Sequence, residues 1–102
     1  MQFSQKEKSR IKQTLVSALS AEKEVRRVIV FGSFLSENNP NDLDIAVFQD
    51  SDANYLELAM RYRKDIRSIS RRIPVDLIPL KFGAPADSFL SEIEKGEVIY
   101  ER

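Results

Sequence analysis

The spacing of apolar residues near the N-terminus is typical of an amphipathic helix. Apolar positions recur at i, i+4, i+7 and i+8, which predicts a helix over residues 3–22 with one face toward a core. Ser4 and Glu7 stand three residues apart at its start and fit a capping box. The chain therefore opens with a helix that has a defined first turn.

A second and stronger helical pattern lies in the middle of the chain. Apolar residues keep a three-or-four spacing over about residues 53–72, which predicts one long helix. Asp50 or Asp52 is expected to cap its first turn, and Pro74 is expected to end it.

Four short runs of β-branched and aromatic residues predict strands, at 28–31, 43–48, 75–80 and 97–100. Between the last two, Pro85 begins a short predicted helix that Gly96 ends. The order α-β-β-α-β-α-β predicts an α+β fold, with a small mixed β-sheet and helices packed on it. We expect residues 1–102 to form a single domain.

The composition excludes several classes of chemistry. The chain has 102 residues, sixteen Lys+Arg against sixteen Asp+Glu, no histidine and no cysteine. A Ser-His-Asp triad, a thiolate nucleophile and a Cys/His zinc site are therefore excluded. The net charge of zero argues against general affinity for nucleic acid. No apolar run approaches the roughly 18 to 20 residues of a membrane span, so we expect a cytoplasmic protein with no membrane partner.

Three aspartates occupy strand-like segments. Asp42 and Asp44 are two residues apart, so both carboxylates should project from the same side of a strand. Asp76 is a lone carboxylate in an otherwise apolar run. Buried charges are usually paired or bound to metal, and converging carboxylates suit Mg²⁺ or Mn²⁺.

A structural explanation of the same aspartates also stays open. Asp42 could cap a turn, Asp44 could face solvent and Asp76 could pair with Arg72. The segment 50–52 has the same D-x-D spacing, but it lies among small polar residues, where helix capping explains it. The first pair differs because apolar strand residues surround it.

Gly32 and Ser33 follow the first predicted strand. A glycine there lets the backbone turn tightly and approach a ligand, while the serine hydroxyl and following N–H groups can donate to phosphate oxygens. A lone Gly-Ser pair is also typical of an ordinary turn. Its weight comes from the order of strand, Gly-Ser, carboxylate pair and third carboxylate.

This order resembles the nucleotidyltransferase superfamily that includes DNA polymerase beta, and in particular its minimal nucleotidyltransferases. The segments that carry the resemblance are Val30-Phe31-Gly32-Ser33, Asp42-Leu43-Asp44-Ile45, Val75-Asp76-Leu77 and the ending from Gly96 to Arg102. The resemblance implies that Gly32 and Ser33 hold ATP or another nucleoside triphosphate. It also implies that Asp42, Asp44 and Asp76 are catalytic and bind two Mg²⁺ ions, with Mn²⁺ as the alternative.

The resemblance further implies a partner. Many such small proteins are antitoxins that transfer AMP from ATP to a tyrosine of a helical HEPN-type toxin, so we expect a homo- or hetero-oligomer. The loop 34–41 departs from the family pattern because it lacks an arginine and a further glycine. The alternative is therefore a catalytically weak or inactive binding module that neutralises a partner by contact. A third possibility is an unrelated small α/β regulatory domain.

The long predicted helix carries a basic run. Six of its residues from 61 to 72 are Arg or Lys, against Asp65 alone. Such a run is usually a solvated face, and the sharper hypothesis is a docking surface for an acidic partner or nucleic acid. Tyr55, Tyr62 and Tyr100 are expected to be packing residues.

Overall fold

A four-stranded mixed β-sheet forms the centre of the computed structural model, which describes residues 2–83, 91 and 93–102. In the order β3-β2-β1-β4, β1 pairs antiparallel with both β2 and β4, and β2 pairs parallel with β3. The strands are β1 (Val25–Phe31), β2 (Leu43–Gln49), β3 (Val75–Lys81) and β4 (Glu97–Glu101). This arrangement confirms the predicted fold class.

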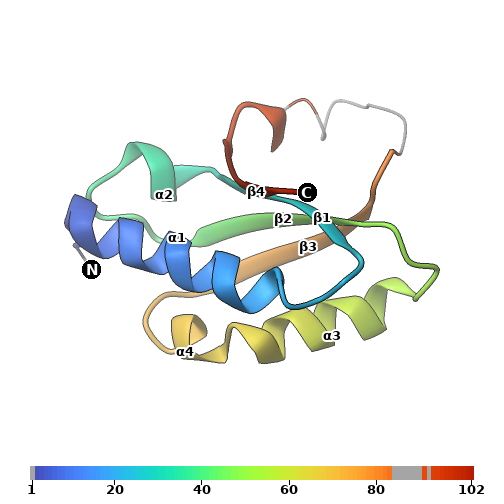
Figure 1. Cartoon of the computed structure of the whole chain (residues 1–102). Helices are drawn as coiled ribbons and strands as arrows, with labels where there is room; N and C mark the ends of the chain where they lie inside the picture. The colour runs from blue at the N-terminus through green and yellow to red at the C-terminus, as the bar shows by residue number, and fades with distance from the viewer. Residues whose placement is uncertain (1, 84–90, 92) are drawn as a thin grey trace.

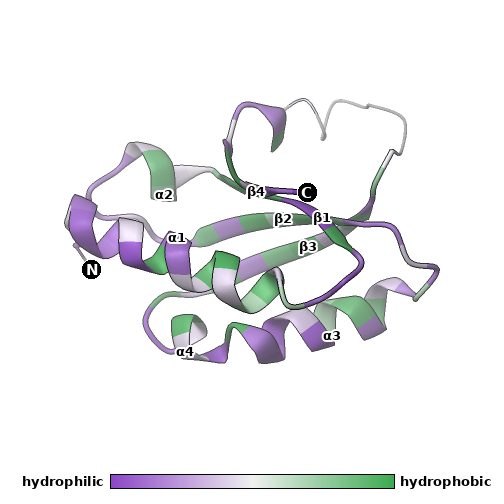
Figure 2. Cartoon of the chain, viewed as in Figure 1, coloured by the Kyte–Doolittle hydropathy of each residue, from purple (hydrophilic) through white to green (hydrophobic). Residues whose placement is uncertain are grey.

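Two helices cover one face of the sheet (Figure 1). They are α1 (Gln5–Leu19) and α3 (Tyr55–Asp65), and the short α4 (Arg67–Ser70) follows α3 in the same layer of helices. Figure 2 shows hydrophobic positions recurring along these helices and the central strands. The larger core lies between the two layers and contains, among others, Ile11, Leu15, Val28, Val30, Leu43, Ile45, Tyr62, Ile66 and Leu77.

The second face of the sheet carries a smaller apolar cluster. Ile29 of β1, with Ala46 and Phe48 of β2, packs there with Ile93. Because strand side chains alternate, Asp44, two residues before Ala46, lies on this second face, away from α1 and α3.

Helices form at both of the long helical positions that the sequence predicted, but the predicted extent of the second was wrong. Ser4 and Glu7 form the predicted capping box of α1. The long helix predicted over 53–72 is instead two helices, separated at the fully buried Ile66 (φ −111°, ψ 25°). Its cap is also corrected, because Asn54 accepts the Glu57 N–H at 2.9 Å.

The strands match their predicted positions, with β1 starting three residues earlier than expected. Pro79 is tolerated within β3 because β3 is an edge strand. One element, α2 (Ser33–Ser36), was not predicted. The helix predicted from Pro85 lies largely outside the described residues. Across the described part of the chain, no helix has the length and apolar character needed to cross a membrane.

Candidate active site

The Gly32-Ser33 turn lies directly against β2. β1 ends at Phe31, Gly32 adopts φ 78° and ψ −156°, and α2 begins at Ser33. A β-carbon at Gly32 would overlap Oδ2 of the Asp44 carboxylate. Glycine is therefore required twice, for its positive φ and for its contact with Asp44.

The three predicted aspartates are brought to one end of the two parallel strands. Asp44 on β2 is the register partner of Asp76 on β3, and Asp42 lies immediately before β2. Asp42 and Asp76 are exposed, whereas Asp44 is partly buried. Burial raises the pKa of the Asp44 carboxyl, and repulsion first from Asp76 and then from Asp42 raises it further. The three carboxylates thus act on one another electrostatically.

Within the described residues, none of these three aspartates forms an ion pair, and Asp76 does not pair with Arg72. Instead, an Arg72 guanidinium nitrogen lies 3.2 Å from Glu7.

The second D-x-D pair behaves differently. Asp50 lies 3.2 Å from an Arg26 nitrogen, and Asp52 lies 3.3 Å from Lys81 Nζ. The prediction that one of them caps α3 was wrong. Asp50 and Asp52 are thus each paired with a cation of the chain, whereas the strand aspartates have no such partner among the described residues.

The chemistry of the strand carboxylates fits a divalent cation. They supply hard oxygen ligands that carry negative charge and have no counter-ion among the described residues. As the side chains stand, no three carboxylates in that part of the chain are close enough together to hold a metal ion.

A cavity of about 280 Å³ adjoins the Gly32 turn. Its lining includes Gly32, Ser36, Lys95 and Gly96. Gly96 lies so close to β1 that an added β-carbon would overlap the Val30 carbonyl oxygen, which fixes the chain beside the turn. Lys95 therefore supplies a cationic side chain to this cavity. Sequence analysis missed Lys95 because nothing in the sequence indicates that Gly96 lies against β1 beside the Gly32 turn.

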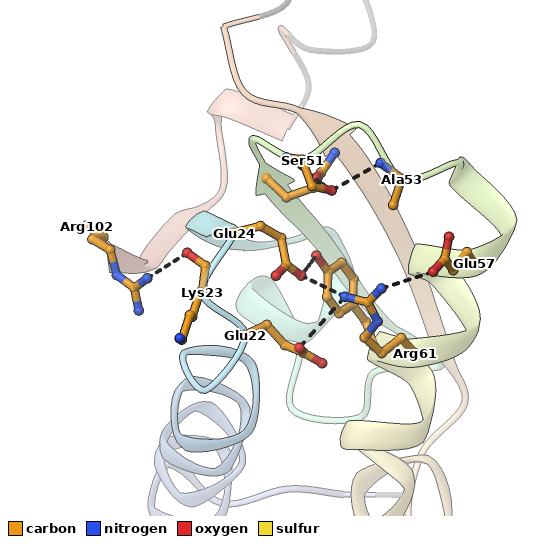
Figure 3. Close-up of polar contacts among 10 residues, drawn as sticks. Glu22, Lys23, Glu24, Ser51, Ala53, Glu57, Arg61 and Arg102 are labelled. Atoms are coloured by element: carbon orange, nitrogen blue, oxygen red, sulfur yellow. Dashed lines mark hydrogen bonds and ion pairs between the residues drawn. The ribbon is translucent and has the colours of Figure 1, made fainter.

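A second group of carboxylates lies where the α1–β1 connection meets α3 (Figure 3). Arg61 is 3.3 Å from Glu24 and 3.9 Å from Glu22, and the Tyr62 hydroxyl donates to Glu24 at 2.6 Å. A hydrogen bond with Asp65, burial and repulsion by carboxylates raise the pKa of Glu22 to about 7. Arg61 pairs with the carboxylates of this group, so a structural role explains them.

The three tyrosines differ in how deeply they are buried. Tyr62 is fully buried, as predicted, whereas Tyr55 is 57% exposed and is not a packing residue. Tyr100 is partly buried, and its hydroxyl accepts from Arg102 Nε at 2.8 Å.

The fold is that of a nucleotidyltransferase domain, and comparison with known proteins agrees. The family model "Polymerase beta, Nucleotidyltransferase" matches residues 13–102, so the chain belongs to this family. No curated protein matches the chain.

Two solved structures are similar. A protein from Sulfolobus solfataricus described as a candidate nucleotidyltransferase has 18% identity and a TM-score of 0.64, over 93% of this chain and 84% of that one. At this identity the likeness concerns the fold alone. CdnC from E. coli MS115-1, solved with ATP, has 25% identity and a TM-score of 0.51 over 78% of this chain. The match covers 34% of CdnC, about a third of its length.

Proposed function

We propose that this protein is a metal-dependent nucleotidyltransferase that transfers AMP from ATP to a hydroxyl group of a partner protein. The observation that carries the proposal is the set Asp42, Asp44 and Asp76, which adjoins a glycine turn and has no cationic partner among the described residues. ATP as donor is supported by the similar protein CdnC, which was solved with ATP.

In the mechanism we infer, Asp42 and Asp44 would hold two Mg²⁺ ions, and Asp76 would be a further ligand to one of them. When bound, the ions offset the charge of the carboxylates and of a triphosphate with about four negative charges, and they stabilise the leaving pyrophosphate. Gly32 and Ser33 position the phosphates, and Lys95 faces them from the adjoining cavity. The acceptor oxygen bonds to the α-phosphorus, the bond to pyrophosphate breaks, and Asp76 accepts the hydroxyl proton.

The acceptor that we propose is a tyrosine of a helical HEPN-type toxin, which makes this protein its cytoplasmic antitoxin and places the two in a hetero-oligomer. The family resemblance supports this acceptor. Two of the chain's own tyrosines are unsuited as acceptors, because Tyr62 is buried and Tyr100 is engaged by Arg102, whereas Tyr55 is exposed.

The experiment uses ATP radiolabelled at the α-phosphate, a co-purified HEPN-type partner and either Mg²⁺ or a chelator. We expect label on a partner tyrosine with Mg²⁺ and none with chelator. Asp42→Asn with Asp44→Asn should abolish labelling. Asp50→Asn with Asp52→Asn is the matched control, because it removes the same charges at the same spacing outside the site. A wild-type protein that labels no partner contradicts the proposal.

A second candidate function is a binding module that neutralises its partner by contact. Two observations favour it. No three of the described carboxylates are close enough together to hold a metal ion. The loop after Ser33 also lacks an arginine. Asp44→Asn separates the two functions. A binding module should still neutralise the partner after this substitution, whereas a transferase should not.

A further inference from the structure

The outward side of α3 and α4 combines exposed apolar and basic side chains. Leu56 is 67% exposed and Met60 is 64% exposed, which places them among the most exposed large apolar residues described. Spacings of three and four residues put them on one side of the helix, opposite the buried Leu58 and Tyr62. The outer stripe, as we call this surface, consists of Leu56, Met60, Arg63, Lys64 and Arg67.

Five of the six basic residues from 61 to 72 fall into two groups. Arg61 is paired with Glu24 and Glu57, each at 3.3 Å, and Arg72 is paired with Glu7 and lies over the Phe3 ring. These two arginines stabilise the fold. Arg63, Lys64 and Arg67 are exposed and form no ion pair with any described residue. Their charge is directed outward.

The outer stripe is also hollowed. A groove of about 330 Å³ is lined by Met60, Arg63, Lys64, Arg67 and Ser70. An apolar side chain of a ligand could therefore contact Met60 while its acidic neighbours reach the three cations.

We propose that the outer stripe binds an acidic amphipathic helix of a partner protein. Charge complementarity identifies an acidic ligand, and Leu56 and Met60 supply the apolar contact on which helix packing depends. From Leu56 to Arg67 the stripe is about 16 Å long at the rise of a helix, which matches about three turns of a partner helix.

A protein helix fits this surface better than a nucleic acid does. Phosphate contacts use Arg and Lys but gain nothing from two aliphatic side chains that are more than half exposed. The net charge of the whole chain is also zero.

The outer stripe lies on the opposite side of the sheet from the candidate active site. α3 packs on the sheet face that carries Ile45, whereas Asp44 lies on the other face. Binding at the stripe would leave the Gly32 turn uncovered. The proposal does not depend on nucleotidyl transfer.

The test measures fluorescence anisotropy with a labelled synthetic helical peptide of about 14 residues, rich in Glu and carrying Leu at i and i+4. We expect binding that weakens with added salt. Arg63→Glu with Arg67→Glu should reduce affinity about tenfold or more, because two attractions become repulsions. Met60→Ser should reduce it about threefold to tenfold. Lys6→Glu with Arg10→Glu on α1 is the matched control and should leave affinity unchanged.

Circular dichroism and thermal melts establish that each variant is folded, which is expected because all substituted residues are exposed. A peptide with both leucines replaced by serine should bind more weakly. The proposal is overturned if wild type does not bind the peptide, if the α1 variant loses affinity equally, or if a single-stranded RNA or duplex DNA binds the stripe in preference to the peptide.

Discussion

Two groups of interacting carboxylates in this molecule differ in how far neighbouring residues compensate their charge. Around Glu22, a hydrogen bond with Asp65 is the main cause of the raised pKa, and Arg61 opposes the shift. Around Asp44, burial is the main cause, Asp76 and Asp42 add to it, and no cation among the described residues opposes it. In the first group, neighbouring residues supply a hydrogen-bonded carboxylate and a cation, whereas in the second the described part of the chain supplies neither.

This difference indicates which group is available for a ligand. A carboxylate that already has an arginine and a hydrogen-bonded neighbour gains little from an added cation. Carboxylates that repel one another without a counter-ion gain much from one. Acidic residues alone do not indicate a site, but uncompensated acidic residues in an apolar strand do.

The largest effect is expected from Asp44→Asn. We expect nucleotidyl transfer to fall about a thousandfold or more, because the transition-state charge loses its support. Without metal, the same variant should be slightly more stable, because the raised pKa of Asp44 means that its charged form is unfavourable in the fold. Initial rates and urea denaturation check the two effects.

The control for Asp44→Asn is Asp52→Asn, which removes a carboxylate that is paired with Lys81. It should leave activity unchanged and stability equal or slightly lower. A destabilised and fully active Asp44→Asn variant would show that the two groups of carboxylates do not differ as described.

The next effect is expected from Gly32→Ala. The new methyl group should displace the Asp44 carboxylate, so activity should fall about tenfold to a hundredfold. The positive φ should also cost about 1 kcal/mol of unfolding free energy. Gly83→Ala is a matched control, because Gly83 has φ 85° but nothing lies within 4 Å of its added β-carbon.

Gly83→Ala should lose less stability than Gly32→Ala, because its added β-carbon meets no other atom within 4 Å, and it should keep full activity. If both alanine variants keep full activity, the contact between Gly32 and Asp44 does not position the carboxylate for catalysis.

The sequence predicted most of the fold because its patterns were local. The capping box at Ser4, the apolar spacing of α1 and the β-branched strands each depend on a few neighbouring residues. The break at Ile66 could not be seen in this way. The apolar spacing continues through Ile66, which is fully buried, so the pattern gives no sign of the change in its backbone.

The candidate site was predicted only in part, because its geometry depends on contacts between segments that are far apart in the sequence. Strand alternation places Asp42 and Asp44 on one side, but the register that brings Asp76 opposite Asp44 depends on pairing across more than thirty residues. The absence of counter-ions within the described residues is equally non-local, because Arg72 is used by Glu7 instead. Lys95 is beside Gly32 only because Gly96 lies against β1.

A smaller effect is expected from Lys95→Gln, which removes the cation beside the Gly32 turn. The KM for ATP should rise about threefold to tenfold while kcat changes less than about twofold, because the lysine acts on bound phosphate rather than on the reacting atoms. Steady-state kinetics check this split. Lys23→Gln, at an exposed position away from the cavity, should change neither constant. An unchanged KM for Lys95→Gln would show that this lysine does not act on bound ATP.

The smallest effect is expected from Glu22→Gln, which tests the group with the internal arginine. The pKa of Glu22 is about 7 in the fold against an ordinary value of 4.5, so the native state keeps a proton that the unfolded state loses between these values. The stability contributed by this proton is complete below pH 4.5 and is lost as the pH rises through about 7. Glutamine cannot ionise and keeps a hydrogen-bond donor for Asp65, so the variant should be more stable than wild type at about pH 8, by about 1 kcal/mol after allowance for solvent screening.

Urea denaturation at about pH 5 and about pH 8 measures this difference. Glu57→Gln, which changes another carboxylate on Arg61, is the control and should not remove the dependence on pH. Nucleotidyl transfer should be the same in both variants and wild type, because neither residue lies near Asp44. A Glu22→Gln variant that lost activity but kept the wild-type pH dependence of stability would contradict this comparison. It would show that the group around Glu22, and not the group around Asp44, serves catalysis.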